Sequence, residues 1–144
     1  MITRPDNLYE FKRFVFLLTH SYIIDILWLV KLTPDPLTSV WLRDFVADSE
    51  NFDWDAGNRE KNAKHEVSDE EIESILAQEK YIFAGRIIEP FHEEWRGLIL
   101  GESSEGRPLA LIFTRRGDKF RPISCRPMRV FEWRLYEESI KEHS

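Results

Sequence analysis

Residues 107–136 constrain the fold of this chain most, because two strand-like runs and a turn are followed by a helical pattern. The runs at 109–114 and 120–125 are rich in β-forming residues, and Gly117-Asp118 between them is a hairpin signal. Pro127 stands at the expected start of a helix over 128–140. The segment also holds eight lysines and arginines against two acidic residues, in a chain of net charge −6. This basic segment predicts an anionic ligand, with phosphate as the first candidate.

The preceding residues predict the rest of an α+β domain. Asp55 is placed to cap a polar helix over 56–65, and Ser68 with Glu71 forms a capping box before an apolar stripe of helical spacing. A short strand is expected at 52–54, longer strand-like runs follow at 81–88 and 97–101, and a glycine at 106 marks another hairpin. We therefore expect two helices, an antiparallel meander and a closing C-terminal helix.

Residues 1–50 differ in character, so we expect a helical extension over 1–50 and a compact domain over 51–144. The apolar run Phe14–Val30 is interrupted by four polar residues. It could be a docked helix, a dispensable or spurious extension, or a membrane contact. A bilayer span usually needs about 20 apolar residues, and Asp25 would add roughly 2.5–3.5 kcal/mol at its centre, so a membrane span is disfavoured. A further short helix is expected over 40–46.

Composition argues against several kinds of site. Cys125 is the only cysteine, which excludes an internal disulfide and fits a reducing cytoplasm. As a lone cysteine at the end of an apolar strand, it is expected in the core rather than in catalysis. Four scattered histidines without a C-x-x-C or H-E-x-x-H motif give no recognisable metal spacing. No metal or cofactor is therefore predicted.

Three blocks of the sequence resemble the BrnT toxin family. FDWDAGNREKNAKHEVSDEEIE (residues 52–73) is similar to the family signature, roughly W-D-x-G-N-x-x-K-N-x-K-H-G-V-S. The stretch from His92 to Arg96 resembles an H-x-x-x-R block. GRPLALIFTRRGDKFRPISCRPMRVFEWRLYEE (residues 106–138) resembles the family's G-R-x-hydrophobic-F-T-x-R, R-P-I-S-A-R and E-x-x-x-Y-E blocks in order. The resemblance covers roughly three-fifths of the chain.

The resemblance implies a fold similar to the RelE-like ribonucleases and an endoribonuclease toxin that cuts RNA and arrests translation. It also implies a cognate antitoxin similar to BrnA. The toxin is expected to contact operator DNA only indirectly, through this antitoxin. Glu66 stands where the family favours glycine, and a positive φ there would strain it. Cys125, Pro127 and Arg129 also depart from the family pattern. These departures leave an alternative: a decayed, non-catalytic module that still binds an antitoxin or repressor.

Metal-free RNA cleavage needs a base for the ribose 2′-hydroxyl, an acid for the leaving 5′-oxygen and cations for the phosphorane. Arg126 follows a strand, and its planar fork could bind two phosphate oxygens or simply pair with Glu132. Glu132 and Tyr136 lie four residues apart on one helix face. Glu132 could act as the base and Tyr136 as a donor or stacking group, or both could fasten the helix to the sheet.

Basic residues elsewhere complete the predicted site. His65 is a candidate acid–base group, although a histidine at a helix end often caps a carbonyl. Arg116 and Arg121 flank the predicted turn, where they could bind RNA or remain solvated. The predicted catalytic residues are Arg126, Glu132, Tyr136 and His65, and the predicted RNA-binding residues are Lys61, Lys64, Arg116 and Arg121.

Overall fold

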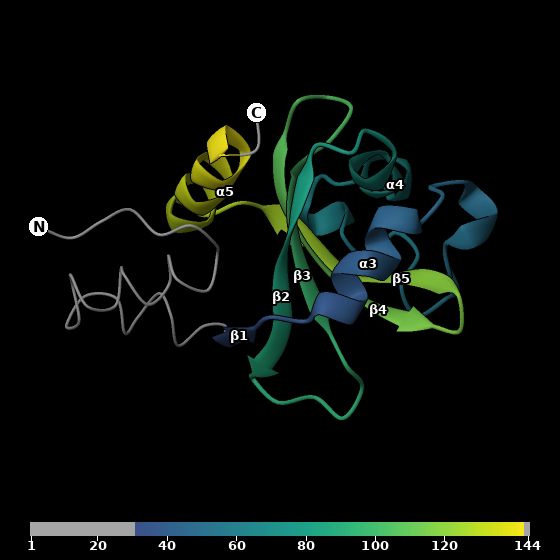
Figure 1. The fold of residues 1–144 in the computed structure, drawn as a ribbon. Helices are drawn as coiled ribbons and strands as arrows, with labels where there is room; N and C mark the ends of the chain where they lie inside the picture. Colours follow the sequence, from purple (N-terminus) through teal and green to yellow (C-terminus); the bar gives the residue numbers. More distant parts are fainter. Residues whose placement is uncertain (1–30, 143–144) are drawn as a thin grey trace, which may run out of the picture.

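The computed structural model describes residues 31–142, in which a five-stranded antiparallel sheet carries helices on both faces (Figure 1). The sheet order is the chain order: β1 (Lys31–Thr33), β2 (Tyr81–Glu89), β3 (Gly97–Glu102), β4 (Pro108–Arg116) and β5 (Lys119–Pro127). The α-helices of this part are α3 (Pro36–Asp44), α4 (Asp69–Ala77) and α5 (Val130–Glu142). These elements confirm the expected α+β fold with an antiparallel meander and a closing C-terminal helix.

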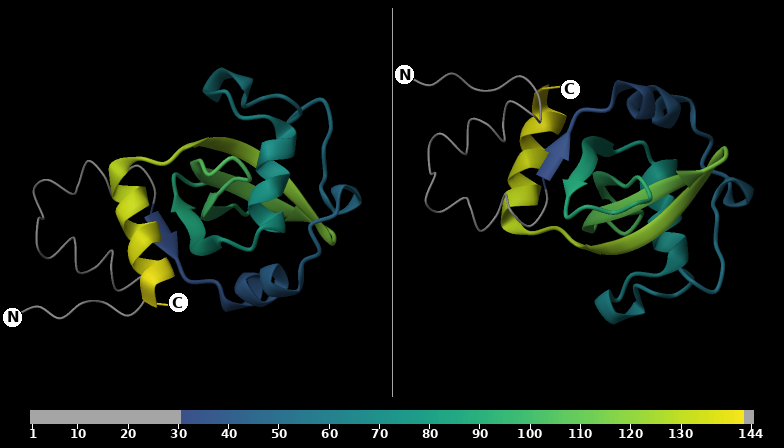
Figure 2. Two further views of the ribbon diagram at one scale, coloured as in Figure 1. Left: turned by 90° about the horizontal axis from the view of Figure 1, so that it is seen from above. Right: turned by 90° about the horizontal axis from the view of Figure 1, so that it is seen from below.

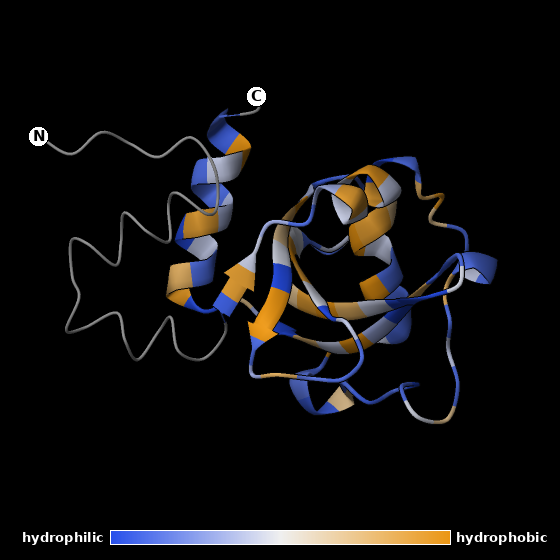
Figure 3. Cartoon of the chain, turned by 60° about the horizontal axis from the view of Figure 1, so that its bottom comes forward, coloured by the Kyte–Doolittle hydropathy of each residue, from blue (hydrophilic) through white to orange (hydrophobic). Residues whose placement is uncertain are grey.

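Alternation along the strands gives the sheet two apolar faces. Leu111 and Phe113 of β4 share a core with Ile72 of α4, and we call this side the α4 face. Ala110 of the same strand shares a second core with Leu135 of α5, on the α5 face. The views from above and below show the twisted sheet between these helices (Figure 2). Hydrophobic positions follow the strands and α4, whereas the segment before α4 is largely hydrophilic (Figure 3).

Phe120 of β5 occupies the centre of an aromatic cluster on the α4 face. Its fully buried ring stacks on Phe113 with centroids 4.4 Å apart. Trp41 of α3 lies parallel to the same ring at 6.3 Å. Phe45 and Phe52 approach it at 5.7 and 5.6 Å. The cluster joins α3, the segment after it and the β4–β5 hairpin into one core.

Residues 31–44 lie against the domain predicted for 51–144. β1 pairs with β2, and Leu42 of α3 is buried in the α4-face core. α3 begins before the expected helix over 40–46, because Asp35 accepts a hydrogen bond from the Thr38 N–H and Pro36 fits the first turn. The readings of Phe14–Val30 concern residues outside the described part, and the boundary at residue 51 stays a prediction. Within residues 31–142, no helix is long and apolar enough to cross a membrane.

The predicted helix over 56–65 is wrong: apart from one 3₁₀ turn at Ala63–His65, this segment consists of turns. Asp55 does accept a hydrogen bond from the Gly57 N–H at 2.8 Å, but Asn58 accepts one from the Asp55 N–H at 2.8 Å. Such local side-chain bonds compete with helical ones. Glu60 then adopts a positive φ of 54°, and a right-handed helix cannot continue through a residue in this conformation.

Both late hairpin turns form as predicted, but the last helix begins later than predicted. The Gly106 and Gly117 turns are confirmed, with φ of 75° and 62°. Pro127 was expected to open the last helix, but it pairs with Leu109 and ends β5 instead. The ladder continues through Met128, whose N–H reaches the Pro108 carbonyl at 3.0 Å. The helix therefore begins only at Val130.

The expected short strand at 52–54 is reduced to a single parallel bridge between Phe52 and Phe120. The expected capping box forms in part, because the Ser68 hydroxyl accepts a hydrogen bond from the Glu71 N–H at 3.1 Å. The Glu71 carboxylate turns elsewhere, accepting hydrogen bonds from Ser103 at 2.7 Å and Arg107 at 2.9 Å. α4 is thereby tied to the turn between β3 and β4.

Glu66 adopts the left-handed conformation, with φ 60° and ψ 32°. Its exposed side chain sits where the family favours glycine, and Arg107 binds only its carbonyl oxygen, at 2.7 Å. Because glycine carries no Cβ penalty here, Glu66→Gly should raise the free energy of unfolding by roughly 0.5–1 kcal/mol, measured by urea denaturation. Glu66→Ala keeps the Cβ and should give no such gain. An equal gain from alanine would contradict the backbone explanation.

Candidate functional site

A polar pocket lies where the turn segment before α4, the loop before β3 and the β4–β5 hairpin meet. Four of its lining residues are basic, and Glu94 is the one acidic residue among them. We call it the basic pocket. Its lining residues are Gly57, Asn58, Lys61, Glu94, Arg96, Arg116, Arg121, Pro122 and Ile123.

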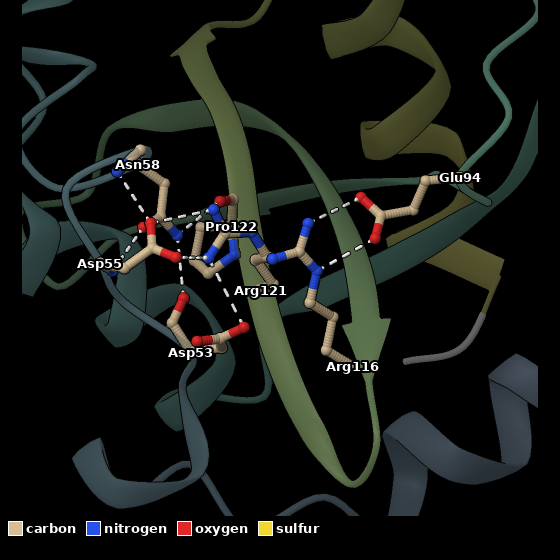
Figure 4. A network of polar contacts seen from close by, with 8 residues as sticks. Asp53, Asp55, Asn58, Glu94, Arg116, Arg121 and Pro122 are labelled. Atoms are coloured by element: carbon tan, nitrogen blue, oxygen red, sulfur yellow. Dashed lines mark hydrogen bonds and ion pairs between the residues drawn. The ribbon is translucent and has the colours of Figure 1, made fainter.

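Arg121 of β5 forms one wall of the basic pocket and is held there by carboxylates. Its guanidinium donates two hydrogen bonds of 3.0 Å to Asp55 and lies 3.5 Å from Asp53 (Figure 4). The Arg121 hydrogen bond, aided by the Gly57 N–H, holds the pKa of Asp55 below its usual value. The arginine side chain is only 10% exposed, so its orientation is fixed before any ligand arrives.

Arg116 at the end of β4 forms a second ion pair, with Glu94. Its Nε and Nη2 donate to the two carboxylate oxygens at 3.0 and 3.3 Å. Figure 4 shows Arg121 and Arg116 near one another, with Asp55 and Glu94 on opposite sides of the pair. The hydrogen bond from Arg116 lowers the pKa of Glu94, and the same bond raises the pKa of Arg116. Glu94 is therefore a carboxylate at neutral pH.

Arg96 and Lys61 differ from these two arginines, because no carboxylate of the described residues lies within ion-pair distance of either. The Arg96 Nε is buried and has no hydrogen-bond partner, while its Nη1 lies 3.5 Å from the His92 ring. A buried charged donor without an acceptor is unfavourable in a protein. Arg96 thus brings to the basic pocket a positive charge that no carboxylate of the described residues neutralises.

The W-D-x-G-N-type signature explains how the pocket is built. Its residues cover the outer edge of β5, where main-chain groups would otherwise lack partners. The Asp53 N–H donates to the Phe120 carbonyl at 2.8 Å, and the Asn58 amide donates to the Pro122 carbonyl at 3.0 Å. These bonds place the turn segment, including Lys61, beside the pocket.

A β-bulge brings Arg121 and Arg126 to the same face of β5. The strand pairs Pro122 with Phe113 and Ser124 with Ile112, which leaves one extra residue between them. In a regular strand, side chains five positions apart point to opposite faces. With the bulge, Arg121 and Arg126 stand opposite Thr114 and Ala110, which share the α5 face. The basic pocket and Arg126 therefore lie on one side of the sheet.

Arg126 and Glu132 form a two-pronged ion pair between β5 and α5. The guanidinium nitrogens donate to the two carboxylate oxygens at 2.7 and 2.9 Å. The Arg129 N–H also donates to Glu132, at 2.8 Å. The geometry matches the alternative in which this pair fastens the last helix to the sheet, and Glu132 does not line the basic pocket.

The remaining predicted residues lie elsewhere. Tyr136 is 3% exposed, its hydroxyl donates to the Lys80 carbonyl at 3.1 Å, and burial raises its pKa to about 12. His65 accepts a hydrogen bond from Arg107 through its main-chain carbonyl, at 3.3 Å. Neither residue lines the basic pocket, and neither does Lys64. The structure thus brings Lys61, Arg116 and Arg121 together in one pocket and leaves the other five residues outside it. The roles given to all eight residues stay predictions.

Sequence reasoning did not identify Glu94 or Arg96 as site residues. The H-x-x-x-R block includes Arg96 directly before a strand, and this position was the only available signal. Glu94 meets Arg116 across 22 positions of sequence, and no local pattern reveals such a pair. Burial raises the pKa of the Cys125 thiol to about 12, in agreement with its core assignment. Among residues 31–142, no group of three or more His, Cys, Asp or Glu side chains could hold a metal ion.

Comparison with protein families matches residues 54–132 to a family model described as the ribonuclease toxin, BrnT, of a type II toxin–antitoxin system. No curated protein and no solved structure matches the chain, so the RelE-like fold stays a prediction. The matched span is more than half of the chain and includes all the residues that line the basic pocket. Membership of a type II system implies an antitoxin partner. The chain therefore belongs to the BrnT family of ribonuclease toxins from type II toxin–antitoxin systems.

Proposed function

We propose that this protein is a metal-independent endoribonuclease toxin that cuts RNA in the cytoplasm and thereby arrests translation. The observation that carries the proposal is the basic pocket, which gathers four cationic side chains in a member of a ribonuclease family. Planar guanidinium groups match the oxygens of a phosphate diester. They also stabilise the negative charge that builds up on phosphorus during cleavage.

The prior positioning of the arginines supports phosphate binding in the pocket. Arg121 and Arg116 are each held by two hydrogen bonds to a carboxylate. Side chains that are already ordered lose little conformational entropy when a ligand binds. Arg96 and Lys61 add two further positive charges, and no carboxylate of the described residues pairs with either.

We infer that the RNA strand runs along the α5 face of β5, from the basic pocket to Arg126. Five residues of strand span roughly 15 Å, enough to contact more than one backbone phosphate. In this arrangement Arg126 binds a phosphate next to the one that is cut. The shared side of Arg121 and Arg126, which the bulge produces, supports this path.

The antitoxin partner is proposed to be a BrnA-like protein that covers the basic pocket and carries the operator-binding domain. Exposed apolar side chains suit a protein contact, and Phe91, 79% exposed, lies on the loop that also carries Glu94 and Arg96. The same observation favours the alternative function, a decayed toxin that binds its partner without cutting RNA. Cleavage activity separates the two.

The purified full-length protein should cut RNA in the presence of EDTA, and Arg126→Ala should abolish cutting while the protein stays folded. Cutting in EDTA is expected because arginine side chains, and not a metal ion, are proposed to bind the phosphates of the substrate. Arg126→Ala should abolish cutting because it removes one of these phosphate contacts. Gel analysis of RNA fragments measures cutting, and circular dichroism checks the fold.

Arg134→Ala is the matched control, because Arg134 is an exposed arginine of α5 outside the basic pocket. It should cut like the wild type. Full activity of Arg126→Ala would refute the role of Arg126. A wild-type protein that neither cuts RNA nor arrests growth on induction, yet binds its antitoxin, would favour the non-catalytic alternative.

A further inference from the structure

We propose that Glu94 is the general base of RNA cleavage, a role that rests on the function proposed above. Glu94 lies on the loop between β2 and β3 and is the one acidic residue that lines the basic pocket. No histidine is among the lining residues. A base must lie within hydrogen-bond reach of the proton that it removes, so the pocket offers Glu94 for this task.

Other possible bases are less well placed. Glu132 is buried and lies outside the basic pocket, and besides two hydrogen bonds from Arg126 it accepts a third from the Arg129 N–H. Glu94 also accepts two hydrogen bonds from an arginine, but its side chain is 42% exposed and lines the pocket. Tyr136 is buried and its hydroxyl is bound to a main-chain carbonyl. His92 is exposed and contacts Arg96, but it does not line the pocket. His92 is therefore the competitor that an experiment has to address.

Arg116 can hold Glu94 and a phosphate at the same time. A guanidinium has five N–H donors, and Glu94 accepts two hydrogen bonds from Arg116. The remaining donors are available to a phosphate oxygen. The carboxylate would then sit beside the bound phosphate, near the 2′-hydroxyl of the adjoining ribose.

The charged groups around Glu94 keep it ionised. The hydrogen bond from Arg116 of β4 lowers its pKa most. Burial has the next largest effect and raises it, and the charges of Arg116, Arg121 on β5 and Arg96 on the same loop lower it further. Lys61 of the turn segment also lines the pocket. The groups that lower the pKa of Glu94 are all cationic, so Glu94 is ionised throughout the neutral range, which is the protonation state that a general base needs.

The reaction is a transesterification in which atoms and electrons balance. Glu94 takes the proton of the ribose 2′-hydroxyl, and the 2′-oxygen forms a bond to phosphorus. The bond from phosphorus to the 5′-oxygen breaks, and this oxygen takes a proton from water, which regains one from Glu94. The products are a 2′,3′-cyclic phosphate and a 5′-hydroxyl end. The surrounding arginines stabilise the phosphorane charge.

The test compares Glu94→Gln with Glu93→Gln, a neighbouring exposed glutamate that does not line the pocket. Glu94→Gln should slow cleavage about 10²–10⁴-fold, the usual contribution of a general base. Its affinity for a 2′-O-methyl RNA oligonucleotide, which has no hydroxyl to activate, should not fall. Glu93→Gln and His92→Gln should cut near the wild-type rate. Circular dichroism confirms that each variant is folded.

The pH dependence of cleavage gives a second measurement. If Glu94 had only a structural role, changing its pKa would not shift this pH dependence. The logarithm of the wild-type rate should rise with pH and level off above the lowered pKa of Glu94. Arg116→Gln removes the hydrogen bond that lowers this pKa, so the rise should move to higher pH, whatever the overall loss of rate.

Three results would overturn the assignment: wild-type cleavage by Glu94→Gln, an unmoved pH rise in Arg116→Gln, or loss of the rise in His92→Gln. If the wild-type protein cuts no RNA at any pH, the proposed function fails and the role of Glu94 fails with it. In the first three cases the wild type still cuts RNA, so the two failures are distinguishable.

Discussion

Phe120→Ala should lower the free energy of unfolding by about 3–5 kcal/mol, the usual cost of removing a buried aromatic ring. The Phe120 ring is fully buried and stacks on Phe113 at 4.4 Å, with rings from α3 and the following segment around it. Alanine would leave a cavity that several elements line. Since small domains are stable by only about 5–15 kcal/mol, this variant should unfold at much lower urea concentration.

Phe91→Ala is the matched control for Phe120→Ala. Its ring is 79% exposed, so the stability should change by less than about 0.5 kcal/mol. Urea denaturation followed by tryptophan fluorescence measures both variants. A loss below about 1 kcal/mol for Phe120→Ala would show that the aromatic cluster can close over the missing ring.

Arg96→Ala should slow RNA cleavage about 10²–10³-fold, the effect typical of losing one preorganised donor to the transition state. The side chain makes no ion pair with the described residues, and its buried Nε lacks an acceptor. Removing it should therefore leave the stability nearly unchanged. Affinity for single-stranded RNA should fall, and the slope of log affinity against log salt should shrink by about 0.7.

Arg86→Ala serves as the control for Arg96→Ala, because Arg86 is an exposed arginine of β2 that does not line the basic pocket. Arg96→Lys tests geometry, since it keeps the charge and loses the planar fork. It should recover salt-dependent binding more than cleavage. Equal rates for Arg96→Ala and Arg86→Ala would show that the phosphate binds elsewhere.

The strands and hairpins were predictable because their signals are local. The Gly106 and Gly117 turns need left-handed backbone, and the runs beside them alternate as strands do. The helix predicted over 56–65 was wrong because the asparagine side chains of this segment form hydrogen bonds to residues that are distant in the sequence. The Asn58 amide reaches the Pro122 carbonyl, 64 positions along the chain, and such bonds replace the helical pattern.

The candidate site was predictable only in part. Lys61, Arg116 and Arg121 were expected to bind RNA on sequence grounds, and the fold places them around one pocket. Their grouping with Arg96 and Glu94 depends on the meeting of three separate segments. The common side of Arg121 and Arg126 depends on one extra residue in β5, and strand periodicity alone predicts the opposite arrangement.

The short strand β1 has a consequence for handling this toxin. It closes the outer border of β2 from Arg86 to Glu89, and Lys31 adds an ion pair to Glu89 at 3.3 Å. A chain trimmed to start at residue 51 would bare those amides and carbonyls, which neighbouring molecules could then pair with. Such a truncation would thus favour aggregation through the exposed edge of β2, even though all the residues of the basic pocket would still be present.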